Sequence, residues 1–341
     1  MLVFSAEKLT ESARRIFVAV GAPEDIADTV ARSLVESNLA GHDSHGVIRV
    51  PAYVQQIRAG RMVPDARPSV VRETATTAVV SGNWGFGQLA AFYATDLAIK
   101  KATESQTATI GCVQTNHVGR LGEYSEIVAR VGLLAMTTVG GFAGSGAVAP
   151  FGGAGRALGT NPISFGVPAE QHPPVIVDFA TSMVAEGKLQ VARAKHAAIP
   201  EGWILDKEGR PSTNAEDFYA GGMLLPFGGH KGYALSIVAE ILGGSLAGVE
   251  AYRDERQGAG FFIYVLDPAA FRPLAEFDSS VDRLVDKVKA VPPAQGFSEV
   301  LAPGEPEIQS RVRRAVEGVP VPEDTWARLQ AVAAEEGIEL T

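Results

Sequence analysis

The stretch TATIGCVQTNHVGRLGEY, residues 107–124, carries an apolar segment into a polar turn and then into the start of a helix. Thr107–Val113 is short, apolar and rich in β-branched residues, which predicts a buried strand, and Leu121–Ala129 has a helical pattern. In α/β proteins, ligands bind at the turns that follow the carboxyl ends of strands. We therefore expect an α/β or α+β fold in which this turn lies near a ligand.

Short strands and helices alternate on both sides of this stretch. Further strands are predicted at Thr77–Val80, Leu133–Val139, Ile163–Val167, Val175–Asp178 and Phe261–Leu266, and further helices at Gln88–Lys101, Met183–Ala194, Lys231–Leu242, Ser280–Ala290 and Glu323–Glu335. The first 60 residues instead predict three amphipathic helices, which run from Ser5 to Gly21, from Pro23 to Gly41 and from about Gly46 to Ala59. The fold is thus expected to be mixed α/β with an N-terminal helical region.

Composition narrows the class of protein. The 341 residues include 30 basic and 39 acidic side chains, which give a net charge of −9 with no basic run, so no nucleic-acid partner is expected. The single Cys112 cannot form an intramolecular disulfide, and the N-terminus lacks the pattern of a signal peptide. The uncharged segment between Arg130 and Arg156 contains eight glycines, unlike a membrane helix. We expect a soluble, cytoplasmic protein without a membrane partner.

A polar cluster lies between the second and third predicted helices, in GHDSHGVIRV, residues 41–50. Ser44 is placed to cap the third helix, with His45 in its first turn and Arg49 one turn later on the same face. An imidazole that donates a proton to a carbonyl oxygen, beside a guanidinium that binds a neighbouring carboxylate, suits the reduction of a 2-oxoacid. An equally good interpretation of the spacing is structural: Ser44 only caps the helix, His45 is a solvated loop residue and Arg49 is a surface charge. His42 and His45 also have the spacing of metal ligands, but no further ligand lies nearby in the sequence.

Three other segments carry polar groups at the ends of predicted strands or the starts of helices. His117 is either an acid/base or a structural histidine, and its neighbours Gly119 and Gly122 permit close approach of a ligand to the backbone. In PVIVDFATS, residues 174–182, Asp178 ends a strand and is suited to accept hydrogen bonds from ribose hydroxyls, while Thr181 and Ser182 precede a helix that is suited to bind phosphate. In GGHKG, residues 228–232, His230 and Lys231 begin a long apolar helix, where they favour an anion.

The common dinucleotide fingerprint is poorly represented. Gly85-Phe-Gly87 follows a strand and opens a helix, but no acidic residue ends the next strand at the expected distance. Gly144-Ser-Gly146 is soon followed by Pro150, which argues against a helix there. Neither segment predicts a Rossmann domain.

Seven segments, in order from about residue 40 to residue 307, together resemble the type-2 malate/L-lactate dehydrogenase family, and within it they look most like the hydroxycarboxylate dehydrogenases. The segments are AGHDSHGVIRVPAYV, NHVGRLGEY, VAPFGG, LGTNPISF, VDFATS, PFGGHKGYALSIVAEILGG and APGEPE. The resemblance implies a non-Rossmann NAD(P)-binding fold in a homodimer. It divides the chain into an N-terminal helical region (1–60), a core and dimerisation domain (61–115 with 270–341) and a cofactor-binding domain (116–269).

The resemblance also implies roles for single residues. Ser44 and His45 correspond to the family's proton relay and donor, His117 to an acid/base or substrate-binding histidine, and Arg49 and Thr160 to substrate contacts. The implied cofactor contacts are His45, Gly119, Arg120, Leu121, Asp178, Phe179, Ala180, Thr181, Ser182, His230, Lys231, Pro303, Gly304 and Glu305.

The expected activity is hydride transfer between NAD, or alternatively NADP, and a small 2-oxoacid or 2-hydroxyacid, with no metal. The alternatives are a cyclic-imine reductase of the piperideine-2-carboxylate type, a metal-dependent hydrolase centred on His42 and His45, and a non-catalytic nucleotide-binding protein. Oxidation of NADH with an oxoacid or with an imine separates the two reductases. Bound metal without NADH oxidation would indicate the hydrolase, and cofactor binding without turnover would indicate the binding protein.

Overall fold

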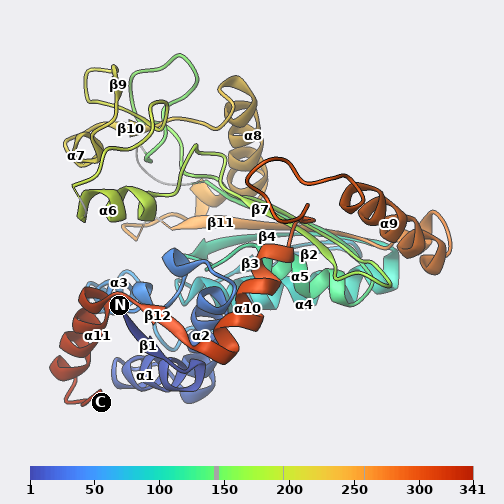
Figure 1. The fold of residues 1–341 in the computed structure, drawn as a ribbon. Helices are drawn as coiled ribbons and strands as arrows, with labels where there is room; N and C mark the ends of the chain where they lie inside the picture. The colour runs from blue at the N-terminus through green and yellow to red at the C-terminus, as the bar shows by residue number, and fades with distance from the viewer. Residues whose placement is uncertain (142–145, 195, 257, 341) are drawn as a thin grey trace.

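The computed structural model describes residues 1–141, 146–194, 196–256 and 258–340. Three parts are visible in Figure 1: a helical N-terminal region, a long central sheet with helices on one side, and a smaller region of helices and short strands that contains α6 and α7. In the described part of the chain, no helix combines the length and the apolar character needed to cross a membrane.

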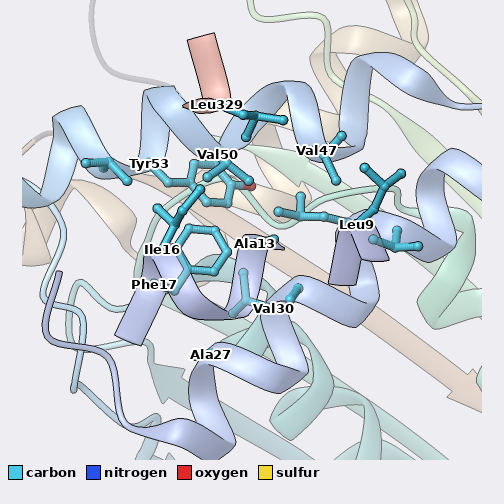
Figure 2. Packing of buried hydrophobic residues seen from close by; sticks show 14 of the residues in the cluster. Leu9, Ala13, Ile16, Phe17, Ala27, Val30, Val47, Val50, Tyr53 and Leu329 are labelled. Carbon is cyan, nitrogen blue, oxygen red and sulfur yellow. The ribbon is translucent and has the colours of Figure 1, made fainter. Parts of the chain in front are cut away.

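The N-terminal helices pack around one apolar core. They are α1 (Ala6–Ala19), α2 (Glu24–Leu39) and α3 (Val50–Arg58). The side chain of Ser5 caps α1 as expected, because its hydroxyl accepts a hydrogen bond from the Lys8 amide. The same core includes α11 (Glu323–Glu335), and β1 (Leu2–Phe4) pairs with β12 (Val319–Val321). Figure 2 shows Leu329 of α11 beside the side chains of the first helices, so the two ends of the chain form one unit.

The third predicted helix begins later than expected. Two short 3₁₀ turns, Asp43–His45 and Val47–Arg49, precede α3 and are separated by Gly46 in an extended conformation (φ −88°, ψ −154°). The regular helix starts at Val50, where Pro51 lies in the first turn and needs no hydrogen-bonded amide. Our prediction that Ser44 caps this helix was therefore wrong. His45 also lies before the helix and not in its first turn.

The central sheet has seven strands in the order β2-β3-β4-β11-β5-β6-β7. These are β2 (Ser69–Glu73), β3 (Thr77–Ser81), β4 (Thr107–Thr115), β5 (Leu134–Gly140), β6 (Ile163–Val167), β7 (Val175–Phe179) and β11 (Ala259–Leu266). All six predicted strands are confirmed. Of the six pairings in this sheet, β3–β4 is parallel and the other five are antiparallel, unlike the parallel sheet of a Rossmann domain. The mixed α/β fold is confirmed.

Helices α4 (Gly87–Ser105) and α5 (Gly122–Arg130) cover one face of the sheet (Figure 1). Small side chains of α4, among them Ala91, Ala94 and Ala98, let it lie close to the strands. The turn between β4 and α5 holds His117, and the start of α5 lies next to the end of β7. The sheet thus places two of the predicted polar segments side by side.

The third region surrounds a small sheet of β10 (Met223–Leu224), β8 (Ile204–Leu205) and β9 (Pro211–Ser212). It includes α6 (Glu186–Ala194), α7 (Ala215–Tyr219) and α8 (His230–Glu240), which continues as a π-helical segment over Ile241–Ser245. Two further helices, α9 (Leu274–Lys289) and α10 (Glu305–Glu317), follow β11. Helix α10 and the short strands were not predicted, and Gly144 of the glycine-rich alternative lies outside the described residues.

Candidate active site

Ser44, His45 and Arg49 lie together, although no regular helix joins them. The Ser44 hydroxyl is 3.0 Å from Nδ1 of His45, and Nε of Arg49 donates a hydrogen bond of 2.6 Å to the Ser44 carbonyl. Because that bond uses Nε, the terminal nitrogens of the guanidinium are left to other partners. Gly187, at the start of α6, packs against the Ser44 side chain, because a Cβ built on Gly187 would lie 3.2 Å from Cβ of Ser44.

The loop that carries these residues is fastened from behind by Asn38, which is 3% exposed. Its amide nitrogen donates to the Asp43 carboxylate at 2.7 Å, and its amide oxygen accepts from the Val47 backbone at 2.9 Å. A Cβ on Gly46 would come within 2.2 Å of that oxygen, so only glycine permits this close approach. From α10, Arg314 donates to both oxygens of Asp43, at 2.6 and 3.0 Å.

His117 joins His45 from the turn after β4. The two imidazole rings are stacked, with centroids 5.4 Å apart and planes inclined by 21°. Nδ1 of His117 lies 2.6 Å from the Tyr53 hydroxyl and 3.3 Å from the Gly119 amide nitrogen. The Tyr53 hydroxyl in turn accepts a hydrogen bond of 2.8 Å from the Gln88 side chain. The structure therefore brings together the two histidines that the sequence placed 72 positions apart.

Both histidines are held neutral near neutral pH. Burial, together with the positive charge of Arg49, lowers the pKa of His45 to about 3. The same two causes lower the pKa of His117 well below its usual value. Each residue is half-buried, so part of it remains exposed to solvent. A neutral imidazole pair beside a guanidinium is suited to bind an anion and to accept a proton from it.

Asp178 and Arg120 form a second group, next to the first. The Asp178 carboxylate accepts a hydrogen bond of 2.7 Å from the Gly122 amide, and burial raises its pKa. Arg120 is 2% exposed, its pairing with Glu126 is long at 3.4 Å, and its Nε has no partner within the described residues. A carboxylate that can accept from ribose hydroxyls, beside an incompletely paired buried cation, fits a nicotinamide dinucleotide.

The Pro303–Glu305 turn reaches the same strand. The Pro303 carbonyl accepts a hydrogen bond of 3.1 Å from the Ile176 amide, and Gly304 adopts φ +98° against that residue. The Glu305 carboxylate, however, accepts hydrogen bonds from Lys289 at 2.6 Å and from the Ala302 amide at 2.8 Å. Glu305 therefore fastens the turn with its side chain, and its backbone remains the part suited to contact a cofactor.

The remaining predicted residues lie along the continuation of β7. Thr181 bonds to the Thr160 carbonyl through its amide at 2.9 Å and its hydroxyl at 3.1 Å, and the Phe227 amide bonds back to the Thr181 carbonyl at 3.0 Å. The ring of Phe179 packs against Phe227, while Ser182 bonds to the Val184 carbonyl. These contacts connect the end of β7 to the segment that leads into α8. None of them involves Lys231.

His230 and Lys231 stand at the first two positions of α8. The ring of His230 packs against Phe151 at 5.9 Å, and the Lys231 side chain is exposed. Among the described residues, the ion pairs include none to Lys231. An exposed cation at a helix N-terminus is consistent with an anionic ligand there.

His42 does not join His45 as a metal ligand. Its Nε2 lies 3.1 Å from the Glu307 carboxylate of α10, whereas His45 faces Ser44 and His117. Within residues 1–141, 146–194, 196–256 and 258–340, no group of three or more His, Cys, Asp or Glu side chains could hold a metal ion. The two histidines thus have different partners.

Sequence reasoning missed four residues that shape the site: Asn38, Tyr53, Gln88 and Arg314. Tyr53 lies one helical turn after Arg49, a spacing that could have drawn attention to it. Gln88 was noted only as the first residue of a predicted helix, and Arg314 belongs to a helix that was not predicted. The sequence features that could have predicted α10 are Glu305 and Pro306 in the first turn and the helical spacing of Ile308, Val312 and Val316.

Comparison with known proteins decides the family. The family model described as "Malate/L-lactate dehydrogenase" matches residues 4–330 of the chain. The chain belongs to the malate/L-lactate dehydrogenase family. Its relatives include the L-sulfolactate dehydrogenase of Methanothermobacter thermautotrophicus, 36% identical over 98% of both chains. They also include the hydroxycarboxylate dehydrogenase B of Escherichia coli, 32% identical over 98% of this chain and 94% of that protein.

A solved structure in the same family has the same architecture. The malate dehydrogenase of Entamoeba histolytica superposes with a TM-score of 0.92 at 26% identity, covering 99% of this chain and 98% of that one. This member of the malate/L-lactate dehydrogenase family is a pyridine-nucleotide-dependent oxidoreductase that acts on the CH–OH group of a 2-hydroxyacid. The family and the class of reaction that the sequence predicted are confirmed.

Proposed function

We propose that the cluster of Ser44, His45, Arg49 and His117 carries out the interconversion of a small 2-hydroxyacid and its 2-oxoacid. The stacked pair of neutral histidines beside Arg49 is the observation that supports this assignment. Oxidation of a 2-hydroxyacid removes a proton from the hydroxyl group and a hydride from the same carbon. The protein must therefore supply a proton acceptor, an anchor for the carboxylate and a place for the hydride acceptor.

His45 is the proton acceptor in oxidation and the donor in reduction. In its neutral form it can take the hydroxyl proton as the C–O double bond forms, and the reverse transfer completes reduction. Ser44, 3.0 Å from Nδ1, fixes the orientation of the ring and exchanges a proton at that atom. A bound 2-oxoacid brings a carboxylate close to the ring, and its negative charge offsets the effect of Arg49 and favours the protonated donor.

Arg49 and His117 hold the substrate. The terminal nitrogens of the Arg49 guanidinium can bind the carboxylate in a two-point contact, which a lysine would not reproduce. His117 lies across the stack from His45 and contacts the carbonyl or hydroxyl oxygen, while Thr160 lies beside the chain that follows β7. The two imidazoles thus approach the same reacting oxygen atom of one small molecule.

A nicotinamide cofactor would be held along the end of β7 and the turns beside it. Bound there, NAD, or alternatively NADP, supplies the acceptor of the hydride in oxidation and its donor in reduction. Asp178 is placed for ribose hydroxyls, and Arg120 and Lys231 for phosphate charge. The other proposed contacts are His45, Gly119, Leu121, Phe179, Ala180, Thr181, Ser182, His230, Pro303, Gly304 and Glu305.

We also propose a homodimer in which each chain comprises three segments that share the central sheet and the terminal helical core. They are the helical region 1–60, the core formed by 61–115 with 270–341, and the cofactor-binding region 116–269. Helix α8 supports the proposal of a partner, because it is apolar on several sides and yet exposes Leu235, Val238 and Ile241. A helix that is apolar all round is normally covered.

The decisive test is turnover by the purified protein. We expect loss of NADH or NADPH absorbance with at least one of pyruvate, oxaloacetate, phenylpyruvate and the oxoacid of sulfolactate, and faster turnover than with a cyclic imine. His45→Ala should lower kcat by about a hundredfold or more while the cofactor still binds, because His45 is one of many proposed cofactor contacts. Undiminished turnover in His45→Ala, or activity restricted to the imine, would contradict the proposal.

A further inference from the structure

A chain of three hydrogen bonds runs through the interior to His117. The Gln88 amide nitrogen donates to the Tyr53 oxygen at 2.8 Å, and the Tyr53 hydroxyl lies 2.6 Å from Nδ1 of His117. The Gly119 backbone nitrogen lies 3.3 Å from the same Nδ1. Gln88 is 0% exposed and Tyr53 is 1% exposed, so solvent does not compete for these bonds.

The polarity of this chain follows from which groups can only donate. A backbone N–H has no lone pair to offer, so Nδ1 of His117 must be unprotonated to accept from Gly119. Nδ1 then also accepts a hydrogen bond from the Tyr53 hydroxyl, and the Tyr53 oxygen accepts one from the Gln88 N–H. If the Gln88 amide were reversed, Tyr53 would donate to it and present a lone pair to Nδ1 across 2.6 Å. An unprotonated Nδ1 would then be repelled, and a protonated Nδ1 would leave the Gly119 N–H without its acceptor, so both arrangements are disfavoured in a buried site.

We infer that Tyr53 and Gln88 are positioning residues that hold His117 as the neutral tautomer with its proton on Nε2. His117 then serves the reaction as a permanent hydrogen-bond donor to a substrate oxygen, and of the two histidines only His45 moves the proton. This inference rests on the proposed function, because it specifies the form in which His117 meets the substrate. The hydrogen bonds among the described residues leave Nε2 without a protein partner, free to donate to a ligand.

The surroundings of His117 favour the same form. Burial and the positive charge of Arg49 oppose protonation of the ring, so the imidazole stays neutral. In the other tautomer, Nε2 would present a lone pair to the carbonyl or carboxylate oxygen of the substrate and repel it. Because the reacting oxygen gains negative charge during reduction, a fixed N–H donor stabilises the transition state more than the ground state.

The tautomer can be measured directly by NMR of ¹⁵N-histidine-labelled protein. The chain has six histidines, and the His117 signals are assigned by their loss in His117→Gln. We expect Nε2 protonated and Nδ1 unprotonated near neutral pH, with and without substrate. A proton on Nδ1, or on both nitrogens, in the wild-type protein would overturn the inference. This readout does not depend on turnover, so failure of the proposed function and failure of the tautomer assignment are separate results.

Gln88→Glu tests the relay by switching its donor off. When the introduced carboxyl is protonated it still donates to Tyr53, but as a carboxylate it accepts the Tyr53 proton and leaves Nδ1 facing a lone pair. We expect kcat close to that of the wild type at low pH and a fall of about tenfold as the carboxyl ionises, accompanied by a shift of the His117 proton to Nδ1. Arg49, His117 and Tyr124 lie near Tyr53 in both proteins, and His45 stacks on His117, so a limb seen only in the variant belongs to the new carboxyl.

Gln88→Met is the matched control, since it keeps the length of the side chain and has no donor at any pH. It should show a lowered kcat without the new limb, and a cofactor Kd equal to that of the wild type. If Gln88→Glu does not fold, Gln88→Met and the wild-type spectrum still decide the matter. Wild-type kcat in either variant, at a pH where the donor is absent, would overturn the assignment of Tyr53 and Gln88. So would an unchanged tautomer in Gln88→Glu once the introduced carboxyl is ionised.

Discussion

Arg49 has two effects on the residues around it. Its guanidinium binds the Ser44 carbonyl through Nε, and its charge lowers the pKa of both histidines. A positive charge that attracts the carboxylate of a substrate thus also keeps the proton acceptor free of protons until the substrate arrives. Binding of an anion and readiness of the base are therefore linked through one side chain.

The pH profile of hydroxyacid oxidation should show this directly. Oxidation needs neutral His45, and with its pKa lowered from 6.5 to about 3 that form is present throughout the working range. We expect kcat/KM for oxidation to show no acidic limb from His45 between about pH 5 and pH 8. Arg49→Met should raise the pKa of His45 and move the limb upward, although burial, the larger cause, remains. The measurement is kcat/KM against pH, and a wild-type limb near the ordinary histidine pKa would contradict it.

At the scale of elements, α10 acts as a fastening that holds the site loop to the body of the protein. Arg314 binds Asp43 beside the catalytic pair, Glu307 binds His42, and Arg311 binds Glu126 of α5 at 2.7 and 3.0 Å. Burial opposes ionisation of Glu126, but its hydrogen bonds to Arg311 and Arg130 outweigh that effect and lower its pKa to about 2. The helix follows directly on the Pro303–Glu305 turn, so one element reaches both the substrate loop and the strand proposed to hold the cofactor.

Removal of one α10 contact should loosen the catalytic loop. In Arg314→Met, the Asp43 carboxylate loses two charge-assisted hydrogen bonds, so we expect the free energy of unfolding to fall by about 1–2 kcal/mol. We also expect kcat/KM to fall by about tenfold, because the loop no longer holds His45 in place. Arg313→Met removes the same kind of side chain from an exposed position on the same helix and serves as control. Urea unfolding and steady-state kinetics check both effects, and equal results for the two variants would speak against a fastening role.

At the scale of the whole molecule, the proposed homodimer rests on exposed apolar side chains of α8 and its continuation. Val238 and Ile241 on α8 and its continuation are 43% and 51% exposed. Contiguous exposed apolar side chains of this kind mark a surface that another protein covers. If the partner is a second copy, burial of α8 in the dimer supplies the shielding that the single chain lacks.

The expected mass in solution is twice the 35.8 kDa of one chain. The double substitution Val238→Asp with Ile241→Asp should yield monomers, because buried unpaired carboxylates at an interface are strongly destabilising. Val316→Asp on α10, where the side chain is 86% exposed, is the control and should leave the mass unchanged. Light scattering during size-exclusion chromatography provides the measurement. A monomeric wild-type protein would rule out the homodimer.

The sequence by itself determined the local features of this protein. Apolar β-branched runs were sufficient to locate the six predicted strands of the sheet, because burial on the strand faces leaves a strong local pattern. The polar segments around Ser44, His117 and Asp178 could also be recognised in the sequence, because clusters of hydrophilic residues stand out between apolar elements. Ordered matching of these segments then identified the family, and with it the class of reaction.

Only the tertiary structure decided how these segments meet. The helix that the sequence predicted from Gly46 begins only at Val50. Asn38 occupies the space beside Gly46, and Pro51 is suited to the first turn of a helix that starts later. The tertiary structure paired His42 with Glu307 and not with His45, and it placed Tyr53 and Gln88 behind His117. Contacts between residues far apart in the chain leave no periodic signal in the sequence, because they depend on the packing of α2, α4 and α10 around one loop. The proton-handling pair was visible in the sequence, while the groups that set its orientation and charge required the fold.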